Sequence, residues 1–337
     1  MGIRRVTFFF TLIIMNLFQT GSGLATKYAG EFLSMGVGAR ALGMGGAFAA
    51  VANDASAVYW NPAGLIQVPQ REIAIMHSER FAGIVKYDWL SYVHPHQDEA
   101  RFGTFGISLI RLGVDDIPIT TLPDETRDFN PHDNRPYILR RVSDVEYALF
   151  LSYARSTSAV LSYGGNVKIL RKSVDKYSAW GLGVDVGLLF KPVERFSLGV
   201  NLQDATKTLI DWDTENGTRE WIAPTLKIGG AYVLGLDFLR GYLTPAVDID
   251  MRFEGRKYAS RFHWGDVSAD VRFGAEYWFR NMLAVRLGSD DIGRFSAGTG
   301  FRFGQMGLNI EQIALDFAFL TKGDLDNTYR ISAAVGF

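Results

Sequence analysis

The sequence contains no cysteine, which excludes a disulfide framework, a thiol nucleophile and a thiolate metal site. It also lacks an excess of charge of one sign, because 35 basic and 36 acidic residues leave a net charge of −1. A nucleic-acid-binding surface is therefore not expected. Beyond the first 25 residues no stretch is apolar enough for a transmembrane helix, which argues against an inner-membrane protein.

Glycine and aromatic residues are abundant, with 36 Gly, 24 Phe and 14 Tyr. This composition favours strands bordered by aromatic bands. Hydrophobic residues make up 47% of the chain and charged residues 21%. Such an average fits either a soluble protein or a transmembrane barrel, whose polar lumen offsets its apolar exterior.

Residues 1–25 have the pattern of a secretory signal peptide. Arg4 and Arg5 precede an apolar run over residues 6–18, and small residues follow at 23 and 25. We expect cleavage before Thr26. The alternative is an uncleaved anchor, but the apolar run is shorter than the roughly 20 residues that a spanning helix needs.

After residue 69 the chain reads as fourteen segments in which apolar and polar residues alternate with a period of two. In the clearest, Trp180 and Leu182 alternate with Gly181 and Gly183. An even number of strands is typical of bacterial single-chain barrels. The three longest connections, at residues 114–143, 204–221 and 254–266, all follow odd-numbered strands. They are therefore expected on the extracellular side.

One face of these segments is apolar and is expected to face lipid. It includes Tyr87, Trp89 and Val93 in the second segment. The other face carries charges in mid-strand and is expected to line a polar lumen. These lumen residues are Lys168, Asp185, Asp248, Asp250, Arg272, Glu276, Arg286 and Arg302. A soluble β-sandwich has the same alternation, but the signal peptide and the terminal Phe337 favour the membrane barrel.

Residues 26–68 are predicted to form a plug inside the barrel. They are rich in Gly and Ala, which lets a threaded backbone pack closely against strands. Asn53 or Asp54 is expected to cap a short helix that runs through Tyr59. Asn61 and Pro62 predict a rigid turn. The alternative is a nucleotide-binding loop, since residues 36–41 loosely fit G-x-G-x-x-A, but no strand precedes them.

The same stretch resembles the plug of FadL-type outer-membrane transporters and, more closely, of the related PorV/PorQ proteins. The resemblance is carried by Gly38-Ala39-Arg40-Ala41, Gly43-Met44-Gly45-Gly46-Ala47, Asn53-Asp54-Ala55 and Trp60-Asn61-Pro62-Ala63-Gly64-Leu65. It implies a fourteen-stranded, all-β transmembrane barrel over residues 69–337 with a blocked lumen. The plug residues that it implies are Gly43, Gly45, Gly46, Asp54, Asn61, Pro62 and Ala63. The final Phe337 resembles the terminal aromatic signal that is read by the outer-membrane barrel assembly machinery.

No catalytic constellation is apparent, and neither an enzymatic activity nor a cofactor is predicted. No G-x-S-x-G motif is present. His94 and His96 are expected in a solvated turn rather than in a metal site. The pairs Asp115-Asp116 and Asp290-Asp291 are expected as solvated loop charges, with weak cation binding as the alternative.

Two functions follow from the resemblance. PorV/PorQ relatives act in type IX secretion, where the barrel handles exported cargo proteins, and an outer-membrane role in transport or secretion of this type is predicted here. The alternative is a passive FadL-type channel for hydrophobic small molecules such as long-chain fatty acids. In that case apolar residues of the third outer loop, Ile117, Ile119, Leu122 and 137–139, are candidates for a receiving surface. Outer-membrane lipid is the expected environment in both cases.

Overall fold

The computed structural model describes residues 29–96, 102–215, 217–253, 260–265, 267–305, 310–321 and 327–337. The predicted signal peptide, residues 1–25, lies outside these ranges. In the described part of the chain, four short helical elements precede the first strand: α2 (Glu31–Ser34), α3 (Ala39–Gly43), α4 (Ala57–Trp60) and the 3-10 helix η1 (Pro62–Gln67). Within the described ranges, no helix has the length and apolar character needed to cross a membrane.

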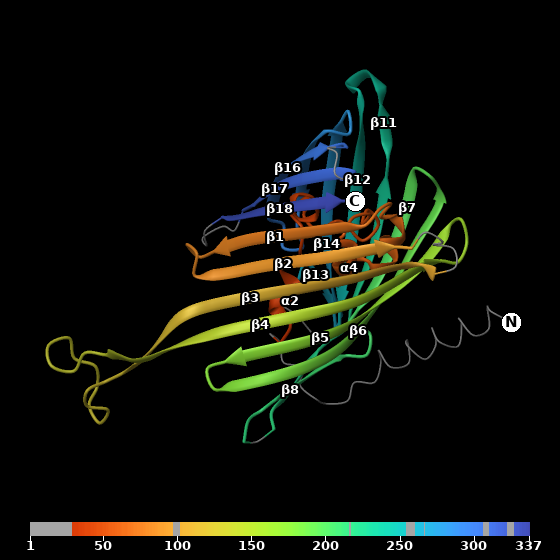
Figure 1. Cartoon of the computed structure of the whole chain (residues 1–337). Coiled ribbons are helices and arrows are strands. Elements are labelled where there is room, and N and C mark those ends of the chain that lie inside the picture. Colours follow the sequence, from red (N-terminus) through yellow and green to blue (C-terminus); the bar gives the residue numbers. More distant parts are fainter. Residues whose placement is uncertain are drawn as a thin grey trace.

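The rest of the described chain is almost entirely β-structure, arranged as a tilted ring of strands (Figure 1). The first half contains β1 (Glu72–Arg80), β2 (Val85–Pro95), β3 (Thr104–Thr121), β4 (Tyr137–Ser156), β5 (Leu161–Val174), β6 (Tyr177–Val193), β7 (Phe196–Gln203), β8 (Thr208–Trp212) and β9 (Arg219–Ile222). The second half contains β10 (Thr225–Tyr232), β11 (Leu234–Leu236), the 3-10 turn η2 (Asp237–Leu239), β12 (Gly241–Arg252), β13 (Phe262–Trp264), β14 (Val267–Phe279), β15 (Leu283–Ser289), β16 (Phe295–Phe303), β17 (Gln312–Leu320) and β18 (Thr328–Gly336).

These strands form a closed antiparallel barrel with fourteen positions around the ring. Each position, called a stave here, is one strand or a series of short strands that follow one another. β7 and β8 form one stave, because β6 pairs with both of them in succession. β9, β10 and β11 likewise follow one another along a single stave. β13 is a short strand in the loop before β14, with which it pairs. The ring closes where β1 pairs with β18 over eight residue pairs. The predicted all-β, fourteen-stranded barrel is confirmed.

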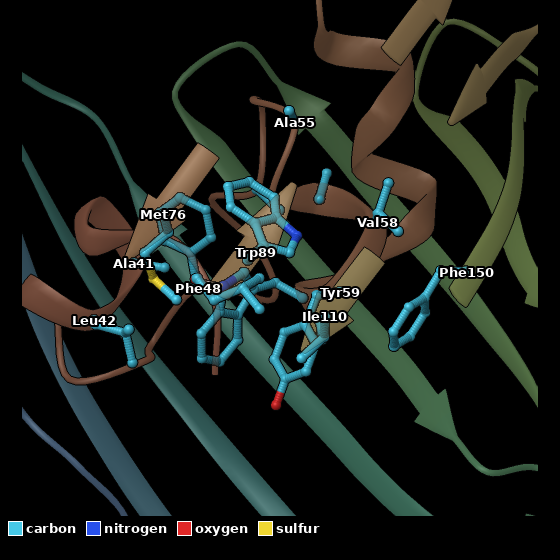
Figure 2. Packing of buried hydrophobic residues seen from close by; sticks show 14 of the residues in the cluster. Ala41, Leu42, Phe48, Ala55, Val58, Tyr59, Met76, Trp89, Ile110 and Phe150 are labelled. Carbon is cyan, nitrogen blue, oxygen red and sulfur yellow. Dashed lines mark hydrogen bonds between the residues drawn. The ribbon is translucent and has the colours of Figure 1, made fainter. Parts of the chain in front are cut away.

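Side chains of a strand point alternately to its two faces, and here the two faces differ sharply. Outward positions hold exposed apolar residues, such as Ile73 and Ile75 on β1. Inward positions hold glycine, small polar residues and buried charges. The prediction was wrong for β2, where Tyr87, Trp89 and Val93 are buried and face inward. They pack there against residues between 29 and 68, which supply apolar partners inside the ring (Figure 2).

The long connections share one end of the barrel, named here the long-loop end; the opposite, short-turn end holds Phe337. Two connections are more ordered than the sequence predicted. β3 and β4 continue to pair past a bulge at Val114 and project beyond their neighbours as a hairpin (Figure 1). Residues 204–221 contain β8 and β9 rather than one loop. Cross-strand pairing satisfies the backbone of these segments, which is why they extend the barrel wall.

Residues 29–68, named here the N-terminal segment, lie inside the ring. α3 contacts β15 to β18 on one side, while η1 contacts β2 to β6 on the other. Nearly every residue from Val37 to Leu65 is buried. Phe48, Tyr59 and Trp89 gather at its centre (Figure 2). Tyr59 and Trp60 pack edge to face, with ring centroids 4.9 Å apart.

Candidate functional site

The N-terminal segment is attached to the barrel wall through buried polar groups. Asp248 on β12 accepts hydrogen bonds from the backbone amides of Phe48 and Ala49, at 2.9 and 2.8 Å. On β18 the Ser332 hydroxyl accepts a 2.6 Å hydrogen bond from the amide of Ala39. Buried backbone amides need such partners. The wall therefore supplies hydrogen bonds that this segment, with its very short helices, cannot make for itself.

Arg40 forms the strongest of these attachments. Its guanidinium binds both carboxylate oxygens of Glu276 on β14, at 2.7 and 2.8 Å, and also contacts Asp54 at 2.9 Å. Glu276 in turn binds Arg286, which reaches Asp316 at 2.7 Å. Burial lowers the pKa of an arginine, but the neighbouring Glu276 and Asp54 outweigh this and raise the pKa of Arg40. Arg40 therefore remains charged.

The predicted lumen residue Asp250 belongs to a second network. It binds Lys227 at 2.7 Å and Arg272 at 2.9 Å. Arg272 also donates to the carbonyl of Gly45, so this network too holds the N-terminal segment. It includes Asp291, which lies 3.0 Å from Arg272 and 3.1 Å from Arg252. Burial alone would raise the pKa of Asp291, but the nearby guanidiniums lower it.

Lys168 and Asp185, both predicted in the lumen, form a third network. Their charged atoms are 2.7 Å apart, and Lys168 also binds Asp204. Asn166 donates both to Asp185 and to the carbonyl of Val58 in the N-terminal segment. The eighth predicted lumen residue, Arg302, differs. In the described part of the chain it has no carboxylate within ion-pair distance, and its guanidinium lies 4.2 Å from the ring centroid of Trp278.

The prediction of solvated charges is wrong for Asp290 and Asp291 but holds for Asp115 and Asp116, which are exposed. Asp290 and Asp291 are held by arginines rather than by solvent, with Asp290 bound to Arg294 at 2.6 Å. Asp115 and Asp116 lie within the lengthened β3 rather than in a loop. No group of three or more histidines, aspartates and glutamates within the described ranges could hold a metal ion.

Glycines allow the wall and the N-terminal segment to approach closely. Gly45 and Gly46 have positive φ angles of 66° and 76°, which favour glycine. A Cβ at Gly288 on β15 would lie 2.3 Å from the amide nitrogen of Gly45. A Cβ at Gly43, the last residue of α3, would lie 3.2 Å from the Cα of Gly298. Five inward wall glycines would collide in this way with the backbone or a side chain of the segment: Gly164, Gly187, Gly199, Gly274 and Gly288.

Asn61 organises the second half of the segment. Its side chain donates to the carbonyls of Ala49 and Leu188, at 2.8 and 3.0 Å, and accepts from the amide of Ala63. Pro62 occupies the first position of η1, where its missing N–H costs nothing. The predicted cap of α4 was wrong: the N-cap residue is Ser56, although the Asp54 carboxylate accepts its amide hydrogen.

Two cavities lie on opposite sides of the N-terminal segment. One, of about 480 Å³, opens toward the long-loop end and includes Met35, Trp60, Arg80 and Arg330 in its lining. The other, of about 230 Å³, lies toward the short-turn end beside Ala39, Arg40 and Glu72. They share no lining residue. The segment therefore separates them.

The sequence missed several residues of these networks. Arg40, Lys227, Asp204 and Asp316 were not singled out as functional. Arg40 lies in the N-terminal segment and Asp204 just after β7, where no strand period applies. Lys227 and Asp316 lie within β10 and β17, but periodicity carries no information about which groups meet.

Comparison with known proteins supports the fold. The family model described as "Uncharacterised protein family (UPF0164)" matches residues 18–117. No curated protein matches the chain. The toluene transporter TbuX of Ralstonia pickettii is similar in structure, with a TM-score of 0.56, 14% identity, and coverage of 89% of this chain and 97% of that one.

Two further solved structures have the same arrangement. A Pseudomonas aeruginosa FadL homologue has a TM-score of 0.54 and 14% identity, with coverage of 87% of this chain and 96% of that one. The Pseudomonas putida toluene transporter TodX has a TM-score of 0.53 and 13% identity, with coverage of 89% and 97%. The chain therefore has the fold of FadL-type barrels.

Proposed function

We propose that the protein is an outer-membrane channel for hydrophobic small molecules, closed in this structure by its N-terminal segment. The observation that carries the proposal is the segment itself, which separates two cavities inside a barrel with an apolar exterior. The fold, shared with toluene transporters, supports it. Cleavage of residues 1–25 and insertion by the barrel assembly machinery belong to the same proposal.

Opening would require the segment to move inside the ring. Because many separate hydrogen bonds attach it to the wall, some of them can break while others hold. The short-turn cavity and the long-loop cavity would then join. The outward rows of apolar residues fit a hydrocarbon layer, and the charged interior is covered by the segment.

The test uses a glycine that holds the segment against the wall. Gly288→Ala would place a Cβ 2.3 Å from the amide of Gly45, so the segment must move while strand pairing is retained. Gly230→Ala is the matched control, since its Cβ would meet only Leu198 at 3.6 Å. We expect toluene uptake by cells, whose lipopolysaccharide layer slows unaided entry, to rise several-fold for Gly288→Ala and to stay unchanged for Gly230→Ala. Equal uptake by cells with wild type, with Gly288→Ala and without the protein would refute the channel.

A second candidate is cargo handling of the PorV/PorQ type in type IX secretion. The observation that favours it is the β3–β4 hairpin, whose Phe129, Ile138 and Leu139 are 62%, 49% and 57% exposed. Projecting apolar side chains are typical of protein contacts. Co-purification from outer membranes would test it: recovery of exported proteins that is lost when Phe129, Ile138 and Leu139 are changed to serine supports this role.

A further inference from the structure

The outward face of the barrel changes character abruptly near the long-loop end. On seven adjacent staves, from β1 to β8, the last apolar row runs in register through Ile75, Leu90, Leu109, Leu149, Ile169, Leu182 and Leu209. Two residues further toward the long-loop end, the next row is charged, polar or aromatic throughout. It is named here the polar row and consists of His77, Asp88, Arg111, Tyr147, Arg171, Trp180 and Asp211. Charges are costly within a hydrocarbon layer, and aromatic residues gather at its borders. In a membrane, the polar row is therefore expected at the level of the lipid headgroups.

A groove of about 490 Å³ lies on the outward face of β18, β1, β2 and β3, which lie side by side in the wall (Figure 1). The outward side chains of its apolar lining are Ile75, Leu90, Leu109, Ile331 and Ala333. The four strands pair without interruption along the groove, so an unbroken wall separates it from the lumen. Its volume is within the usual range for small-molecule sites. The groove therefore opens toward lipid, away from the two internal cavities.

At the end nearer the long loops, the lining of the groove changes to His77, Asp88 and Arg111 of the polar row. Asp88 binds His77 at 2.6 Å and lies farther from Arg111, at 3.4 Å. The Arg111 side chain is 30% exposed. Asp88 and Tyr147 are its hydrogen-bond partners, and a guanidinium has five N–H donors. Arg111 therefore has donors left for a further acceptor at the end of the groove.

The other charged groups near this end already have partners. Glu79 lies 3.7 Å from His77, and Lys86 lies 3.6 Å from Asp115. Glu79, Lys86 and Asp115 do not line the groove. Among the described residues that line it, Arg111 is the one arginine or lysine. An anion at the end of the groove would therefore be bound by Arg111.

The groove thus combines a long apolar surface with a guanidinium at headgroup level. An acyl chain fits the apolar surface. A phosphate fits the guanidinium, because arginine binds phosphate through parallel, charge-assisted hydrogen bonds. Free phosphate would leave the apolar lining uncovered. A hydrocarbon without a headgroup would leave the remaining donors of Arg111 unused.

We propose that this groove binds one membrane lipid with a phosphate headgroup, with an acyl chain along Ile75, Leu90 and Leu109 and the phosphate on Arg111. The inference concerns the outward face and holds whether or not the barrel is a channel. Because β1 and β18 close the ring and both line the groove, the lipid would lie across the closing seam. A ligand that binds only the folded ring stabilises it, so the lipid is expected to stabilise the closed seam.

The test separates the two parts of the lipid. The purified full chain in detergent is mixed with phosphatidylglycerol, with diacylglycerol, which lacks the phosphate, or with glycerol phosphate, which lacks the chains. Native mass spectrometry measures the ligand that stays bound. We expect phosphatidylglycerol to be retained and either fragment to be retained about tenfold less. Arg111→Gln should lower retention of phosphatidylglycerol about tenfold, because charge-assisted hydrogen bonds are lost. Ala333→Leu, which fills the groove, should lower it as well.

Two variants are matched controls. Arg171→Gln removes an arginine of the polar row that lies over Trp180, outside the groove. Ala297→Leu enlarges an outward alanine on β16, also outside the groove. Both should retain phosphatidylglycerol as wild type does. Phosphatidylglycerol should also raise the temperature of the heat-dependent electrophoretic shift in wild type and Arg171→Gln but not in Arg111→Gln.

The outcomes that would overturn the site are distinct. One is equal retention of phosphatidylglycerol in wild type, Arg111→Gln and Ala333→Leu. Another is retention of diacylglycerol as strong as that of phosphatidylglycerol, which would show a hydrophobic contact alone. Retention of glycerol phosphate as strong as that of the lipid would show a site for free phosphate instead. Heat-dependent migration checks that each variant is assembled. If Ala333→Leu is not, Arg111→Gln and Arg111→Lys decide the question, and Arg111→Lys should keep part of the binding.

Discussion

At the residue scale, the lumen is organised by charges that meet across the boundary between wall and N-terminal segment. Periodicity placed Glu276 and Arg286 on the inward face, where both are buried. It did not pair them with Arg40, because the spacing of a strand carries no information about a segment that crosses the lumen. The partner of a buried charge has to be seen in the folded structure.

Replacing Arg40 tests this pairing. Arg40→Met leaves Glu276 buried with one cation instead of two, and removing one partner of a buried pair costs about 3–5 kcal/mol. We expect proteases to cut residues 29–68 much faster in the purified variant while the barrel remains heat-modifiable. Arg40→Lys should be intermediate. Adding Glu276→Gln to Arg40→Met should recover part of the protection; protection equal to wild type in Arg40→Met would contradict the pairing.

At the element scale, strand number and direction could be predicted from sequence, but strand length and one face could not. The alternation of apolar and polar residues over about ten positions identified fourteen strands, because each strand must present one face to lipid and the other to the lumen. The same reasoning failed for β2, since an apolar face can be buried against an apolar plug as well as against lipid. It also ended β3 too early, because alternation fades beyond Val114 although the pairing continues.

The projecting hairpin is expected to be dispensable for the barrel. Deleting residues 117–142 removes only pairs beyond the bulge and keeps those between residues 104–114 and 144–154. We expect the shortened protein to reach the outer membrane in normal, heat-modifiable form. As a control for failed assembly, Ile107→Lys places a charge on the outward apolar face, at a cost of about 2–4 kcal/mol near mid-membrane. A shortened protein that fails as Ile107→Lys does would contradict this expectation.

At the scale of the whole molecule, the ring is complete only when β18 pairs with β1. Phe337 lies at this seam, and its amide donates to the carbonyl of Arg71. If the terminal aromatic residue is the assembly signal, Phe337→Ala should lower the yield of folded protein in outer membranes. Phe303→Ala, which removes another exposed phenylalanine, should not. Equal yields of folded protein for Phe337→Ala and Phe303→Ala would contradict a role of Phe337 as the assembly signal.

The attachments of the N-terminal segment also constrain the order in which the molecule is built. Arg40 and Glu276 are 236 residues apart, and Ala39 and Ser332 are 293 apart. Residues 39 and 40 therefore find these partners only on strands made late, whereas Val58 and Asn61 bind β5 and β6. Arg40 must wait for its wall partner while the sheet curls around the segment. Closing the seam and seating residues 39 and 40 are thus expected to be late steps, and a chain halted before β12 would hold a half-ring to which only the second half of the segment is attached.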